Sequence, residues 1–97
     1  MLFHVTTRTE WDPSAASHTP GGFEAEGFVH LATREQVEGV LERYFDGLPD
    51  LLLLSLDEEE LPSGAVKWEP GAGSEPGPFP HLYAPIPRDA IVAVEPL

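Results

Sequence analysis

Apolar and polar positions alternate from Gly27 to Leu31, and this pattern predicts a β-strand. Successive side chains of a strand point to opposite faces, so Phe28 and His30 share one face and Val29 and Leu31 share the other. The segment therefore presents a histidine at the end of a strand whose opposite face is apolar.

A helix is predicted directly after this strand. Thr33 and Gln36 match a capping box, in which each residue's side chain accepts a hydrogen bond from the other's backbone N–H, and Gly47 is a suitable stop. The free N–H groups at the helix start carry partial positive charge and, with Arg34 beside them, suit a phosphate. The apolar stripe of this helix consists of Val37, Val40, Leu41, Tyr44 and Phe45.

The remaining segments predict short strands, turns and one further helix. Thr9 is expected to cap a short helix that carries Trp11 and extends to Ala16. Residues 17–22 are expected to form a loop that leaves His18 exposed. Residues 70–80, with four prolines and three glycines, predict a longer loop.

Further strands are predicted over residues 2–6, 50–56, 65–69, 81–84 and 90–94. The run 50–56 is apolar without alternation, which is typical of a strand buried on both faces. One strong helix among several strands indicates an α+β fold with a small antiparallel or mixed sheet. The length of 97 residues predicts a single domain over 1–97.

Charge and composition exclude several classes of function. Seventeen Asp and Glu against five Lys and Arg give a net charge of −12, which repels nucleic acid and anionic membranes. The absence of cysteine excludes disulfides and thiolate chemistry. We find no membrane-spanning run and no signal-peptide pattern, so we expect a cytoplasmic protein.

Four polar residues lie in strand-like segments and are candidates for a site: His4, His30, Glu69 and His81. Their spacing matches no metal-binding motif, so no metal is expected. A strand histidine can also be a hydrogen-bonded structural residue, and the sequence leaves both interpretations of His30 open.

Several segments together resemble one family. They are FHVTT at 3–7, EW at 10–11, EGFVHLAT at 26–33 followed by Gln36, KWE at 67–69 and FPHLYAPI at 79–86. In this order and spacing they are similar to domain-of-unknown-function family nine-five-two. The resemblance implies a fold like that of the ADP-ribosyltransferases, a split mixed sheet that cradles NAD.

The resemblance also implies roles for individual residues. His4 with Thr6 matches the position that binds the ribose and adenosine of NAD, and His30 matches the position that orients the nicotinamide side. Glu69 matches the carboxylate that holds the ribose 2′-hydroxyl and stabilises the cation formed as nicotinamide leaves. His81 and Tyr83 look like this family's own additions to the pocket.

These observations leave three hypotheses. An NAD-binding, ADP-ribosyltransferase-like enzyme requires His4, His30, Glu69 and His81 to converge in one cleft. A non-catalytic binding or interaction module predicts dispersed or structurally locked histidines, with an apolar patch near Trp11 or Phe79. Metal binding requires histidine nitrogens around one point. The protein is expected to be a monomer or a homodimer, because small sheets often cover an edge by pairing.

Overall fold

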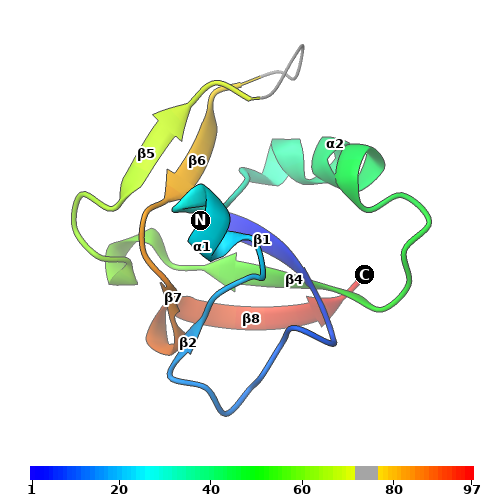
Figure 1. The fold of residues 1–97 in the computed structure, drawn as a ribbon, viewed down its shortest axis with the longest axis horizontal. Coiled ribbons are helices and arrows are strands. Elements are labelled where there is room, and N and C mark those ends of the chain that lie inside the picture. The colour runs from blue at the N-terminus through cyan, green and yellow to red at the C-terminus, as the bar shows by residue number, and fades with distance from the viewer. Residues whose placement is uncertain (72–76) are drawn as a thin grey trace.

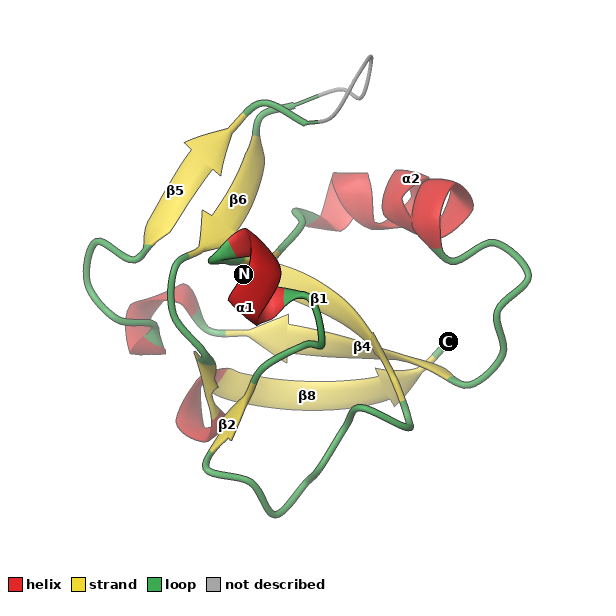
Figure 2. Ribbon diagram, viewed as in Figure 1, coloured by secondary structure: helices red, strands yellow, loops and turns green. Residues whose placement is uncertain are grey.

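The computed structural model describes residues 1–71 and 77–97 and shows small antiparallel sheets with one long helix (Figures 1 and 2). The strands are β1 (Leu2–Thr7), β2 (Ser17–His18), β3 (Val29–His30), β4 (Leu51–Leu56), β5 (Val66–Glu69), β6 (Phe79–Leu82), β7 (Ile86–Pro87) and β8 (Ile91–Pro96), and the helices are α1 (Phe23–Glu26) and α2 (Arg34–Tyr44). The strands pair in the orders β1-β4-β8, β3-β6-β5 and β2-β7. Single 3-10 turns lie at Glu58–Glu60 and Arg88–Ala90.

Strand β4 is the centre of the first sheet. Every residue from Leu51 to Leu56 is buried, and the strand pairs with β1 on one side and β8 on the other. The predicted strand buried on both faces is therefore confirmed. Leu54 and Leu56 have no exposed surface and form the main core with Leu82 and Ile86 from the other sheets.

Within residues 1–71 and 77–97, one isolated antiparallel bridge joins the sheet of β1 to the sheet of β3. Phe3 and Ala32 exchange both backbone hydrogen bonds at 2.8 Å, which ties β1 to the segment just after β3. The bridge brings His4, next to Phe3, close to His30 at the end of β3. The expected α+β class with a split sheet is confirmed, and all strand pairs of the described residues are antiparallel.

Helix α2 begins as predicted, with Thr33 at the N-cap and its N–H donating to Gln36 Oε1 at 3.0 Å. It ends at Tyr44, before Gly47, and Tyr44 is 55% exposed rather than packed like the rest of the stripe. No helix of the described residues has the length and apolarity needed to cross a bilayer. The stripe residues Val37, Val40, Leu41 and Phe45 pack against Phe3, Val5 and Leu53 of the first sheet.

The predicted helix from Thr9 to Ala16 is wrong. Asp12 Oδ1 instead accepts hydrogen bonds from the N–H of Ser14 at 2.9 Å and from its hydroxyl at 2.7 Å. This local bonding competes with the helical pattern, and the segment forms turns. The exposed position predicted for His18 is also wrong, since β2 pairs with β7 and buries this side chain.

Two strand boundaries also differ from the prediction. A single-turn helix, α1, precedes β3 and ends at Gly27, whose φ of 84° is a conformation that glycine adopts without strain. Phe79 and Pro80, predicted as loop, begin β6, which pairs with both β3 and β5. Part of the predicted loop, residues 72–76, lies outside the described residues.

Candidate functional site

Three histidines from three strands lie on the wall of one cavity of about 730 Å³. They are His4 of β1, His30 of β3 and His81 of β6, separated by up to 77 positions in the chain (81 − 4). The split sheet thus brings together the histidines that the sequence had singled out. Phe3, Phe28, Val40, Phe45 and Phe79 supply aromatic and aliphatic wall, and Glu10 and Glu26 supply carboxylates.

His4 is fixed in one neutral tautomer. Its Nδ1 lies 2.8 Å from the backbone carbonyl oxygen of His30, an acceptor, so Nδ1 carries the proton and donates. Burial disfavours the charged ring and lowers the pKa of His4 from 6.5 to about 4, although the bond to the carbonyl opposes this shift. Nε2 is buried and has no partner among the described residues. It is therefore an unsatisfied hydrogen-bond acceptor.

His81 is held by a carboxylate. Its Nδ1 lies 2.7 Å from Glu69 Oε1, and the Tyr83 hydroxyl donates to the same oxygen at 2.6 Å. Both bonds lower the pKa of Glu69, and the bond from Tyr83 has the larger effect. The bond to Glu69 in turn raises the pKa of Tyr83. The ring of Phe28 stacks on that of His81, with centroids 4.1 Å apart. Glu69 and Tyr83 do not line the cavity themselves and reach it through His81.

His30 faces His81 directly across the sheet. The two residues are register partners in β3 and β6, and their rings meet edge to face with centroids 5.3 Å apart. The His30 side chain is 60% exposed, and its Nε2 lies 2.9 Å from Glu26 Oε2. Glu26 was not among the predicted site residues, although it lies four residues before His30, on the other side of Gly27, where the chain turns.

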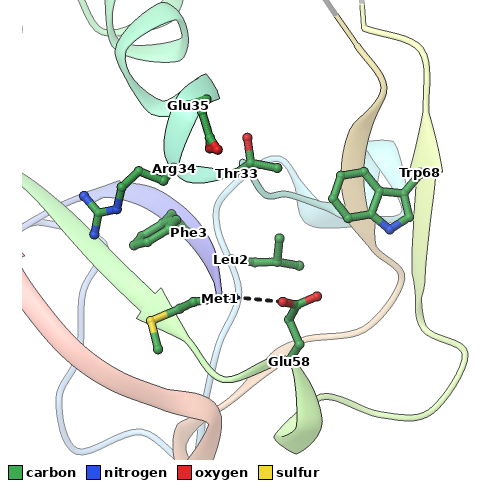
Figure 3. A pocket seen from close by; sticks show the side chains of 8 residues that line it. All are labelled: Met1, Leu2, Phe3, Thr33, Arg34, Glu35, Glu58 and Trp68. Atoms are coloured by element: carbon green, nitrogen blue, oxygen red, sulfur yellow. Dashed lines mark hydrogen bonds and ion pairs between the residues drawn. The ribbon is translucent and has the colours of Figure 1, made fainter.

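Thr33 and Arg34 lie away from this cavity. They line a second, smaller hollow of about 460 Å³, together with Trp68 (Figure 3). The Arg34 guanidinium lies over the Phe3 ring, 4.6 Å from its centroid, and Phe3 lines both cavities. On the far side of the smaller hollow the Met1 amino group pairs with Glu58 at 2.9 Å. The predicted phosphate cradle at the start of α2 is thus separate from the histidines.

Thr6 and His18 lie beside His4 in a buried polar group. Thr6 Oγ1 and His18 Nε2 are buried and have no partner among the described residues. The His18 ring lies between those of His4 and Trp11, with centroid distances of 5.4 and 5.6 Å, and burial lowers the pKa of His18. Thr6 does not reach the cavity wall. A two-residue strand inside a glycine- and proline-rich segment has no periodicity, so no pattern in the sequence pointed to His18.

No group of three or more His, Asp or Glu side chains within residues 1–71 and 77–97 is arranged to hold a metal ion. His30 and His81 each bond a carboxylate through one ring nitrogen, which leaves one nitrogen apiece for a ligand.

Comparisons with known proteins agree with the resemblance seen in the sequence. A model of the family described as "Protein of unknown function (DUF952)" matches residues 5–94. The crystal structure of protein CC0527 from Caulobacter crescentus is 29% identical, with a TM-score of 0.86 over 99% of this chain and 84% of that one. The solution NMR structure of CC0527 is 30% identical, with a TM-score of 0.78 over 99% and 83%. No curated protein matches the chain.

Proposed function

The chain belongs to the DUF952 family of proteins of unknown function, and we propose that it binds NAD or another ADP-ribosyl compound in the histidine cavity, as an ADP-ribosyltransferase-like enzyme. The observation that carries the proposal is the convergence of His4, His30 and His81 on one cavity wall, whereas Glu69, the fourth residue expected there, does not line the cavity and contacts it only through His81. The volume of about 730 Å³ lies within the range of small-molecule sites.

His4 lines the cavity, but its Nε2 is turned into the protein. This nitrogen is a buried acceptor without a partner, which is unfavourable by roughly 1–3 kcal/mol. A ribose O–H would relieve this penalty only after the neighbouring side chains move, because the nitrogen has almost no accessible surface. The aromatic wall formed by Phe3, Phe28 and Phe79 offers flat apolar surface to a nicotinamide or adenine ring.

The charges of the cavity decide which part of NAD enters it. Its described lining contains the carboxylates of Glu10 and Glu26 and no lysine or arginine. This environment favours the positively charged nicotinamide ring of oxidised NAD and disfavours the pyrophosphate, which we place toward solvent. The same reasoning predicts tighter binding of NAD than of NADH, whose nicotinamide ring is uncharged.

A non-catalytic module on the same fold is the alternative. It predicted an apolar patch near Trp11 or Phe79, but Phe79 is only 6% exposed and Trp11 packs against the main core and the His18 ring. The geometry thus favours a small-molecule site over a partner surface at these two residues.

Ligand-induced thermal stabilisation tests the proposal. NAD and ADP-ribose at 100 times their dissociation constants should each raise the free energy of unfolding by about 2.7 kcal/mol, with a smaller effect of NADH at equal concentration. His30→Ala should remove the stabilisation and leave the unliganded protein folded, because most of the His30 side chain is exposed.

The control is Trp68→Ala, which alters the smaller cavity and not the histidine cavity. It should leave the ligand effect unchanged. Stabilisation by NAD that persists in the His30 variant, or that disappears only in the Trp68 variant, would contradict the assignment of the site.

A further inference from the structure

His81 differs from the other histidines in how its carboxylate partner is held. Glu69 Oε1 receives two hydrogen bonds, from His81 Nδ1 at 2.7 Å and from the Tyr83 hydroxyl at 2.6 Å. The side chain of His81 is only 10% exposed, compared with 60% for His30 in its pair with Glu26. The Glu69–His81 pair is therefore the better shielded and the more rigidly oriented of the two.

This geometry fixes the role of each ring nitrogen of His81. A carboxylate can only accept, so Nδ1 carries the proton, and in the neutral ring Nε2 carries a lone pair. None of the described residues hydrogen-bonds Nε2, and His81 lies on the cavity wall. Phe28 stacks on the ring face, His30 lies at 80° to the ring, and the bond to Glu69 holds Nδ1, so these contacts restrain the ring.

We propose that His81, oriented by Glu69, is a general base that removes a proton from a hydroxyl nucleophile in the cavity, water in the simplest case. The inference rests on the proposed function and adds its reaction to it. The nucleophile's proton moves to His81 Nε2, and its oxygen bonds to the anomeric carbon of the nicotinamide ribose. The bond from that carbon to the nicotinamide nitrogen breaks, and its electron pair leaves with neutral nicotinamide.

Glu69 acts in this step as a positioning residue. It holds the ring in the Nδ1–H tautomer, and its negative charge stabilises the imidazolium that forms when Nε2 takes the proton. The two hydrogen bonds that lower the pKa of Glu69 keep this carboxylate ionised while it does so. This role differs from the contact with the ribose 2′-hydroxyl that the family resemblance implied.

The decisive experiment measures nicotinamide release from NAD and, separately, binding of ADP-ribose. Glu69→Gln and His81→Asn should each slow release by ~100-fold or more, the scale of a lost general base, and leave ADP-ribose affinity within ~3-fold. Tyr83→Phe removes only one of the two bonds to Glu69 and should slow release by a few-fold. Glu38→Gln, an exposed charge change on α2, should have no effect.

A second readout does not depend on turnover. Nitrogen-15 chemical shifts should show that His81 is the Nδ1–H tautomer at neutral pH. If they show the Nε2–H tautomer, in the free or the ligand-bound protein, the inference is wrong. Binding without nicotinamide release, or release at the wild-type rate in Glu69→Gln and His81→Asn, would also overturn it and leave the binding proposal intact. A protein that binds neither NAD nor ADP-ribose would contradict the proposed function itself.

Discussion

The four histidines of this chain form two pairs with opposite chemistry. His4 and His18 lie together in the interior, and one ring nitrogen of each is buried without a partner. His30 and His81 face each other across two strands, and each bonds a glutamate. Burial lowers the pKa of both interior histidines, whereas each histidine of the second pair has a carboxylate on one ring nitrogen.

The difference teaches that position in the sheet decides what a histidine can do. The interior pair is a poor base, because burial lowers the pKa of both residues, and His18 does not line the cavity. The paired histidines retain a free nitrogen beside a fixed negative charge, the arrangement that proton transfer requires. A ligand in the cavity meets His4 from the first group and both members of the second.

Acidification should give the largest effect, since it acts on the interior pair. The pKa of His4 is about 4 in the folded chain and 6.5 when unperturbed, so between these values the unfolded chain binds a proton that the folded chain does not. The free energy of unfolding should therefore fall as the pH drops from 6.5 toward 4, by about 3 kcal/mol from His4 in total. The lowered pKa of His18 adds an effect of the same sign.

Urea unfolding at several pH values checks this expectation. The interval from pH 6.5 to 5 limits the contribution of Glu69, because its pKa is lowered from 4.5. His4→Gln, which can still donate to the carbonyl of His30, should flatten the pH dependence in this interval. An unchanged slope in that variant would show that His4 is not the titrating group.

The sequence predicted the positions of His30 and His81 better than those of the interior pair, because these two residues lie in segments with a recognisable local pattern. Alternation placed Phe28 with His30, and the two rings are indeed in contact. The capping box predicted the start of α2 correctly. Because β3 directly precedes this helix, the helix start also limited where the strand and His30 could end. His18 lies in a strand of two residues defined only by its distant partner β7, so no pattern within the segment could reveal it.

The hydrophobic pattern also could not predict which distant segments lie close together in space. The expectation that the start of α2 serves the same ligand as the histidines assumed that neighbours in sequence share a cavity. In the structure, Phe3 packs between the two hollows and separates Arg34 from His30. The Phe3–Ala32 bridge that brings β1 beside β3 is an isolated contact between segments far apart in the chain, which local pattern does not predict.

Replacement of His18 should give an intermediate effect and sharpen the contrast. Its Nε2 is buried and has no partner among the described residues, so His18→Leu, an apolar side chain of similar volume, should raise the free energy of unfolding by about 1 kcal/mol. His18→Asn keeps a polar group there and should destabilise the fold. If Leu destabilised the protein as much as Asn does, His18 would have a hydrogen-bond partner in solution.

The smallest effect is expected at the Glu26–His30 pair. Both side chains are largely exposed, so solvent screens their attraction, and Glu26→Gln should lower the free energy of unfolding by less than ~0.5 kcal/mol at neutral pH. Urea unfolding measures this value, with Glu24→Gln on the same single-turn helix as the matched control for a lost charge in its first turn. A loss above ~1 kcal/mol in Glu26→Gln alone would mean that the pair is shielded from solvent. His30 would then be held by its carboxylate in a shielded environment, as His81 is. The contrast between the two histidine pairs would be smaller, and His30 would compete with His81 as the candidate base.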